Sequence, residues 1–256
     1  MHQSRTLHPP VARVLISFIL PLAGAIVLHG LVSITLRAPA DILPDERGGA
    51  ALLFAGAGAV SLVLGLRWYG LSALGLRGGR PLYASIGFAA LGWVVTIIAR
   101  VFVVGSEQEL VVSPTFARDF IYLVLFEAFA LQLWTFGLLF HSIADWRGPL
   151  TAAVGGGLAF GVAGFLLFEE AYITDLNSLL FFVAWGLFYG LIRLRTGSIL
   201  GMVVVQAMQS LTTWHILLPE AVPHPSELHL LYAITATFYV IFIWRLWPKE
   251  ETDYRV

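Results

Sequence analysis

The sequence predicts an all-α fold, a polytopic membrane protein with about eight transmembrane helices in one bundle. The first observation is composition, since 58% of the 256 residues are hydrophobic and only 12% are charged, whereas a soluble domain carries about 25% charged residues. The second is a series of apolar stretches long enough to cross a bilayer. The third is a one-sided distribution of arginine between the segments that join these stretches.

Eight apolar stretches approach the ~20 residues (range about 17–25) that a membrane-spanning α-helix needs. They cover residues 12–36, 49–66, 82–104, 120–141, 150–168, 176–192, 198–218 and 228–246. The first is longer than the apolar core of a signal peptide and no small-residue cleavage site follows it, so we interpret it as a membrane helix. The sixth is short and begins beside Asp175. The connecting segments are too short for a soluble module, so we expect a single domain over residues 1–256.

Glycine is abundant in the fifth stretch, where residues 155–164 are GGGLAFGVAG. In a soluble helix each Gly costs ~1 kcal/mol relative to Ala. In a membrane, Gly instead permits close approach of neighbouring helices. We therefore expect the fifth stretch to be a central, tightly packed helix.

The basic residues predict the orientation. With eight spans, both termini and the even-numbered loops share one side of the membrane, which then holds eleven of the 15 Lys and Arg residues. These are Arg5, Arg13, Arg67, Arg77, Arg80, Arg147, Arg193, Arg195, Arg245, Lys249 and Arg255. The other side holds Arg37, Arg47, Arg100 and Arg118. Because cytoplasmic loops carry the excess of Lys and Arg, we predict that both termini are cytoplasmic.

Charge and cysteine content exclude several kinds of site. The formal net charge of -1 provides no basic field that would attract nucleic acid. The chain has no Cys, which excludes disulfides, iron–sulfur clusters and thiolate zinc sites.

Polar side chains inside the predicted spans are the first candidates for function. Glu127 lies roughly 13 Å from the outer end of the fourth stretch, at about 1.5 Å per residue. A charged carboxylate at that depth is costly, so the group should be neutral, paired or beside water. Gln206 and Gln209 lie in the seventh stretch, and Gln206 is placed to form a hydrogen-bonded pair with Glu127. Two interpretations stay open: a neutral carboxyl that ties helices together, or part of an active site.

Other candidates lie near the outer ends of the spans. Three interpretations of the adjacent Glu169 and Glu170 stay open: they bind a metal, they act as acid and base, or they are simply solvated at a helix end. His29 and His215 would either ligate a haem or a pigment, or lie at the membrane interface without a ligand. No paired His spacing within one helix favours the cofactor.

One stretch carries a family resemblance. Residues 186–210 are GLFYGLIRLRTGSILGMVVVQAMQS, and they resemble the last motif region of the CPBP family, which comprises CAAX prenyl proteases and bacteriocin-processing (Abi-type) intramembrane proteases. That family has a Gly-rich helix, a short Arg-Thr-Gly-Ser turn and then a helix with an H-x-x-x-N motif. The turn matches at residues 195–198, and residues 69–79 are similar to the segment before the family's third helix. The resemblance covers most of the chain and is strongest over a motif-bearing core at 120–212.

The resemblance implies a first motif, E-E-x-x-x-R, at Glu127, Ala128 and Gln132. One acid is retained, the second acid is an alanine, and the arginine is an amide. Glu127 is therefore the one catalytic candidate that the resemblance carries over.

Two further motifs are implied by the resemblance. The motif F-x-x-x-H falls on Phe160 and Gly164, and H-x-x-x-N falls on Gln206 and Ser210. In the family, the Glu is thought to activate water with help from the two His, as a metal site or a glutamate-dependent hydrolase. Both schemes need an imidazole, and neither a Gln nor a Gly can accept and return a proton. The catalytic motifs of this chain are degenerate.

We therefore expect a catalytically silent pseudoprotease of this family, integral to the plasma membrane of a prokaryote, with no cofactor. Its partners would be the lipid bilayer and another membrane protein or a membrane-associated peptide, bound in a cavity lined by Glu127, Gly164, Gln206 and Gln209. One alternative is an active endopeptidase, CAAX-type or bacteriocin-processing, that uses Glu127 with a partner such as Glu169, Glu170 or His215, and zinc is expected only in that case. The other is a pigment- or haem-associated accessory subunit of a membrane complex.

Overall fold

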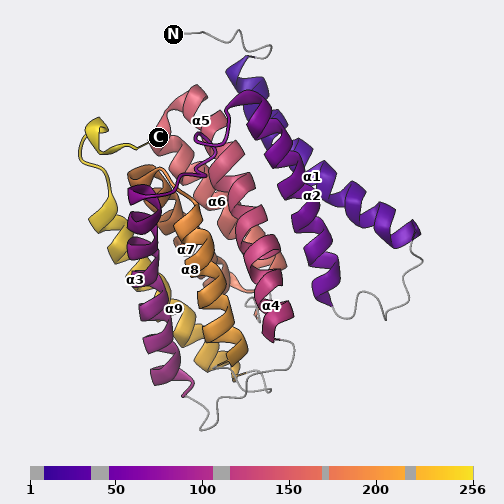
Figure 1. Cartoon of the computed structure of the whole chain (residues 1–256). Coiled ribbons are helices and arrows are strands. Elements are labelled where there is room, and N and C mark those ends of the chain that lie inside the picture. The colour runs from indigo at the N-terminus through magenta and orange to yellow at the C-terminus, as the bar shows by residue number, and fades with distance from the viewer. Residues whose placement is uncertain (1–8, 36–45, 106–115, 169–172, 217–222, 256) are drawn as a thin grey trace.

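The computed structural model describes residues 9–35, 46–105, 116–168, 173–216 and 223–255, in which all regular structure is helical. Long helices run roughly side by side in one bundle (Figure 1). The α-helices are α1 (Pro10–Thr35), α2 (Glu46–Trp68), α3 (Arg80–Val103), α4 (Phe116–Tyr122), α5 (Phe140–Arg147), α6 (Pro149–Leu167), α7 (Leu176–Thr196), α8 (Leu200–Ser210) and α9 (Pro225–Leu246). The remaining helical segments are the π-helices η1 (Leu123–Ala130), η2 (Leu133–Leu139) and η3 (Leu211–Ile216), and the 3-10 turn η4 (Glu251–Asp253).

Among the described residues, seven helices are long and apolar enough to cross a membrane, which makes the chain an integral membrane protein. The prediction of an all-α polytopic bundle is confirmed. The predicted seventh span, at 198–218, corresponds to α8 and η3, which have 11 and 6 described residues.

The helix that runs from α4 through η1 and η2 to α5 is the most buried of the candidate spans, and we call it the long helix. In its most apolar window 78% of the residues are buried, against 44% for α6. The expectation that the fifth predicted span is the central helix is therefore wrong. One face of α6 is open at the surface of the bundle, with Leu158, Val162 and Leu166 between 44% and 68% exposed.

Glycines bring α6 and α7 into close contact, so the expectation of tight packing holds for α6. A Cβ atom added to Gly157 would lie 2.7 Å from the carbonyl oxygen of Gly186, and one added to Gly161 would lie 2.7 Å from that of Phe182. On α7, a Cβ atom at Gly190 would collide with the carbonyl oxygen of Ala153. Each distance is too short for any side chain, so only Gly fits at this crossing.

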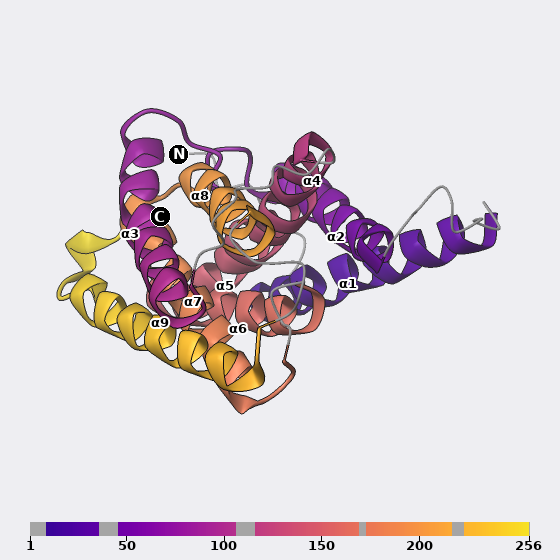
Figure 2. The ribbon, with the colours of Figure 1, turned by 90° about the horizontal axis from the view of Figure 1, so that it is seen from below.

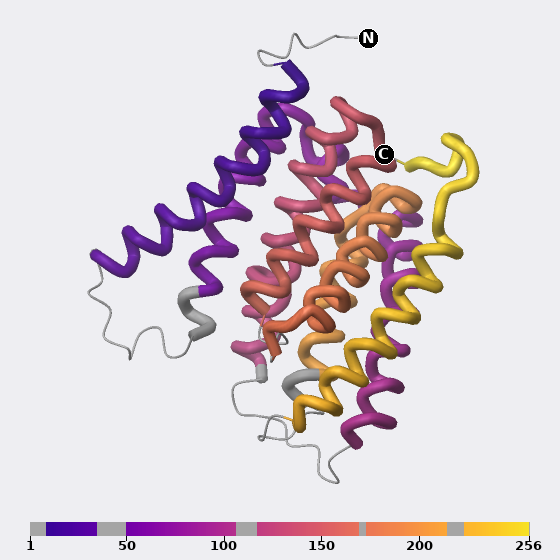
Figure 3. Tube along the Cα trace, turned by 180° about the vertical axis from the view of Figure 1, so that it is seen from behind, coloured from indigo at the N-terminus to yellow at the C-terminus, as the bar shows by residue number. Residues whose placement is uncertain are grey.

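The hairpin of α1 and α2 lies at one side of the bundle. Viewed from below, α1 and α2 extend away from the group formed by α3, α7, α8 and α9 (Figure 2). From behind, α1 diverges from the other helices along its length (Figure 3). The hairpin is held by another close approach, because a Cβ atom on Gly56 would lie 2.6 Å from the carbonyl oxygen of Gly24.

The two ends of the bundle differ in charge. At the end shown at the top of Figure 1, α1, α3, α6 and α8 begin and α2, α5, α7 and α9 end, and we call it the basic end. The described Arg and Lys residues of this end are Arg13, Arg67, Arg77, Arg80, Arg147, Arg193, Arg195, Arg245, Lys249 and Arg255. Those described at the opposite end are Arg47, Arg100 and Arg118.

Candidate functional site

The long helix and α8 meet along a buried polar contact that contains residues from two of the motif positions that the resemblance implies. Ser210 Oγ donates to Glu127 Oε1 at 3.3 Å, and Gln132 Nε2 donates to Gln206 Oε1 at 2.6 Å. The side chains of these four residues are at most 1% exposed. We call Glu127, Gln132, Gln206 and Ser210 the polar seam.

The pairing within the polar seam differs from the one that we expected. A Glu127–Gln206 bond was predicted, whereas Gln206 Oε1 accepts from Gln132 and Glu127 accepts from Ser210. The π-helical geometry of η1 explains the difference. In an α-helix, residues five apart point about 140° away from each other, but a π-helix closes i to i+5 bonds and brings them onto one side. Glu127 and Gln132, five residues apart, therefore both face α8, where Gln206 and Ser210 are four residues apart.

One hydrogen bond joins the two seam amides, although two primary amides can exchange two. Gln132 Oε1 and Gln206 Nε2 are buried without a hydrogen-bond partner in the part of the chain that the structure describes. A buried polar group without a partner costs about 1–3 kcal/mol. The seam is thus a helix contact that retains unused hydrogen-bonding capacity.

Gln209 does not face the polar seam. Its Nε2 donates to the hydroxyl of Tyr239 at 3.2 Å, and that hydroxyl lies 3.3 Å from Thr96 Oγ1. This chain of contacts links α8 with α9 and α3 in the interior of the bundle. Tyr239 and Thr96 were not candidates in the sequence, because a single Tyr or Thr within an apolar helix carries no signal of its partner.

Ala128, where the resemblance would imply a second acid, is fully buried in an apolar cluster with Leu123 of the long helix and with Val203, Ala207 and Leu211 of α8 and η3. The position therefore contributes packing between the long helix and α8.

Phe160 and Gly164 lie in an aromatic cluster. The ring of Phe160 is stacked on Phe136 at 5.4 Å between centroids and meets Trp185 edge-on at 5.7 Å. A Cβ atom on Gly164 would lie 3.1 Å from the Phe182 ring and 3.2 Å from the Phe168 ring. Two phenylalanines thus occupy the space into which an imidazole at position 164 would extend.

The remaining candidate residues are not brought to the polar seam. Glu169 and Glu170 lie outside the described residues, as does the side chain of His215. His29 is half-buried on α1. Among the residues that the structure describes, no three His, Asp or Glu side chains are close enough together to hold a metal ion. The seam itself offers a carboxyl, a hydroxyl and two amides, which do not fit the three protein ligands of a catalytic zinc.

The Arg-Thr-Gly-Ser turn joins three parts of the chain at the basic end. Gly197 has the left-handed conformation (φ 75°) that ends α7. Ser198 Oγ donates to the carbonyl oxygen of Arg77 at 2.8 Å, and the amide of Ile199 donates to that of Gly75 at 2.9 Å. Arg195 pairs with Asp253 at 2.6 Å, which holds the C-terminal segment against the turn.

Arg193, one turn earlier, is a structural residue that sequence reasoning assigned only to the charge bias. Its side chain is fully buried. Its Nε donates to the carbonyl oxygen of Phe136 at 3.0 Å, its Nη2 to that of Ala73 at 2.8 Å, and the guanidinium lies 4.9 Å from the centre of the Phe140 ring. The available signal was a basic residue in the last turn before a C-terminal Gly, which predicts a favourable charge but not its burial.

No protein-family model, no curated protein and no solved structure matches this chain.

Proposed function

We propose that this chain is a divergent CPBP-like membrane protein that does not hydrolyse peptides and that acts as a binding or structural subunit in the membrane. The observation that carries the proposal is the polar seam. Glu127, which would be the catalytic acid, accepts a hydrogen bond from Ser210 in an interior that is closed to solvent. The motif residues that could assist it pair with each other instead.

The chemistry of hydrolysis supports the same proposal. A water nucleophile needs a base with a pKa near the operating pH or a metal ion. Of the two positions at which the resemblance implies a histidine, one is the amide Gln206, and at the other the rings of Phe168 and Phe182 leave no room for an imidazole beside Gly164. Zinc does not fit the donor set of the seam, and no cofactor is included in the proposal.

The proposed setting is the plasma membrane of a prokaryote with the basic end in the cytoplasm. The proposed partner is another membrane protein or a membrane-associated peptide. Exposed apolar side chains cover the outer faces of α1 and α9, so a partner would meet the chain within the bilayer.

Purified protein in liposomes tests the absence of hydrolysis. The substrates are fluorogenic CAAX peptides and bacteriocin leader peptides, and the matched control is Glu127→Ala. We expect equal, background rates for the wild-type protein and the variant, with no stoichiometric zinc in either. Turnover that the Glu127→Ala variant loses would establish the active endopeptidase instead.

The subunit role has its own measurement. After purification in mild detergent, we expect a membrane protein to remain with the chain in a fixed ratio, detected by mass spectrometry after cross-linking in the membrane. A chain that elutes alone and cross-links to no other protein would contradict the subunit role. An absorbance band of a bound chromophore would identify the accessory subunit of a pigment or haem complex.

A further inference from the structure

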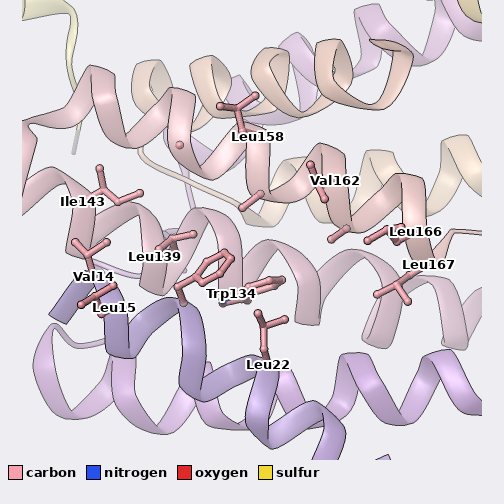
Figure 4. Close-up of a pocket in the computed structure, with 14 residues that line it drawn as sticks. Val14, Leu15, Leu22, Trp134, Leu139, Ile143, Leu158, Val162, Leu166 and Leu167 are labelled. Atoms are coloured by element: carbon pink, nitrogen blue, oxygen red, sulfur yellow. The ribbon is translucent and has the colours of Figure 1, made fainter. Parts of the chain in front are cut away.

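An apolar groove lies between α1 and α6, with the long helix as its floor (Figure 4). Its volume is about 590 Å³, and hydrophobic side chains and one Gly line it. Trp134 and Leu139 of the long helix lie between Leu22 of α1 and Val162 of α6 (Figure 4). Because α1 diverges from the bundle (Figure 3), a gap remains between α1 and α6, and this gap is the groove.

The size of the groove suits a single hydrocarbon chain. Along α6 the groove extends from Gly155 to Leu167, which is about 18 Å at 1.5 Å per residue. One leaflet of a bilayer has about 15 Å of hydrocarbon. The groove is therefore long enough to take one acyl chain.

A cation lies beyond one end of this groove. Ile143 of α5 lines the groove, and Arg147 lies four residues later, one turn closer to the basic end on the same helix face. Arg147 is exposed, and its guanidinium lies 4.6 Å from the centre of the Trp146 ring. The structure records no ion pair between Arg147 and the carboxylates that it describes. An Arg beside an interfacial Trp is suited to a phosphate at headgroup depth.

We propose that this groove holds one acyl chain of an anionic phospholipid, with its headgroup at Arg147. The apolar lining selects the chain, and the uncompensated cation at the groove's end favours an anionic headgroup over a zwitterionic one. The proposal depends on the membrane-spanning fold and not on the proposed loss of peptidase activity.

A second groove, between α7 and α9, provides an internal comparison. It has a volume of about 500 Å³, and it contains the polar side chains of Asn177 and Thr237. Ala233 lines it and is exposed. A bulky residue in place of Ala233 would fill this second groove, which is of similar size but lies away from Arg147, and it therefore serves as a control.

Native mass spectrometry of the full chain in detergent tests the proposal with phosphatidylglycerol and phosphatidylcholine of identical acyl chains. We expect the wild-type protein to retain one lipid, with about fivefold preference for phosphatidylglycerol. Ala159→Phe and Ala163→Phe fill the groove and should each lower retention at least tenfold. Arg147→Gln should still retain one lipid, but the ratio of retained phosphatidylglycerol to retained phosphatidylcholine should fall close to one.

Two control variants should behave as the wild-type protein. Ala233→Phe fills the second groove, and Arg245→Gln removes another exposed cation from the basic end. The proposal is overturned if the wild-type protein retains both lipids equally, or if Arg245→Gln lowers the preference as much as Arg147→Gln. It is also overturned if a second copy of the chain, displaced by Ala159→Phe, occupies the groove in place of lipid.

Discussion

The polar residues of the membrane interior act through their partners, and each partner lies on a different helix. Gln132 and Gln206 join the long helix to α8, and Gln209 joins α8 to Tyr239 of α9. Hydrogen bonds between membrane helices contribute on average only ~0.6 kcal/mol. Their main effect is to fix which faces of the helices meet.

A double-mutant cycle over Gln132 and Gln206 measures that contribution. Gln132→Leu and Gln206→Leu should each destabilise the protein by about 1–2 kcal/mol, because each leaves the other amide buried without its partner. The double variant should lose less than the sum, with a coupling energy of about 0.6–1.7 kcal/mol. Reversible unfolding in mixed SDS micelles gives the free energies. Strictly additive losses would show that the two amides do not interact.

Arg193 should matter more for stability than its neighbour Arg195. Arg193→Met removes a buried guanidinium that donates to two carbonyl oxygens, and each acceptor left buried without its donor should cost about 1–3 kcal/mol. Arg195→Met is the matched control, because its ion pair with Asp253 is partly exposed, and such pairs contribute about 0–1 kcal/mol. The same unfolding measurement compares them, and equal losses would contradict the anchoring role of Arg193.

At the scale of elements, two irregular features decide how the helices meet. The π-helical segments of the long helix rotate side chains that an α-helix would direct apart, and the glycines of α6 and α7 let two backbones touch. The first sets which residues pair in the polar seam. The second brings α7, with Arg193 and the Arg-Thr-Gly-Ser turn, against the rest of the bundle.

The α6–α7 crossing gives a prediction with an internal control. Gly157→Ala places a methyl group 2.7 Å from the Gly186 carbonyl oxygen and should destabilise the protein by about 1–3 kcal/mol through overpacking. Gly87→Ala in α3 meets no atom within 4 Å and should be neutral or stabilising, since Ala is the better helix former. Thermal unfolding in detergent compares the two variants. A neutral Gly157→Ala would show that the helices are further apart.

The elements themselves were predictable, whereas their pairing was not. Apolar length alone identifies the membrane helices, because the bilayer fixes the number of residues that a span needs. The partner of Glu127 depends on a π-helical turn in η1, which no residue pattern in LVLFEAFA announces. The long helix was expected at 120–141 and extends over Ala117–Arg147, since its final turns continue into the basic end. The spacing of residues along the sequence also does not specify which helices contact each other. It therefore predicts neither the aromatic rings beside Gly164 nor the burial of Arg193.

At the scale of the whole molecule, the basic end and the central long helix define two axes. One axis runs across the membrane and carries the charge asymmetry. The other runs from the buried long helix to α1, whose most apolar window has only 22% of its residues buried. The charge difference between the two ends is the basis for the proposed orientation. The low burial of α1 leaves the hairpin of α1 and α2 exposed to lipid.

The absence of Cys from the sequence makes the orientation directly testable with single-cysteine variants. Gly78→Cys lies in an exposed loop at the basic end, and Ser226→Cys is exposed at the opposite end, in the first turn of α9. A membrane-impermeant maleimide should label Ser226→Cys in intact cells and Gly78→Cys only after permeabilisation. The reverse pattern would place the basic end outside.

The rings beside Gly164 close this position to a larger side chain. A histidine at position 164 would require that Phe168 and Phe182, whose rings would lie within 3.2 Å of a Cβ atom there, first give way. Their substitution by smaller residues would open a void among Phe160, Trp185 and Phe54, with which Phe168 is packed. Any variant with an imidazole at position 164 would therefore need several simultaneous core substitutions and would pass through less stable intermediates.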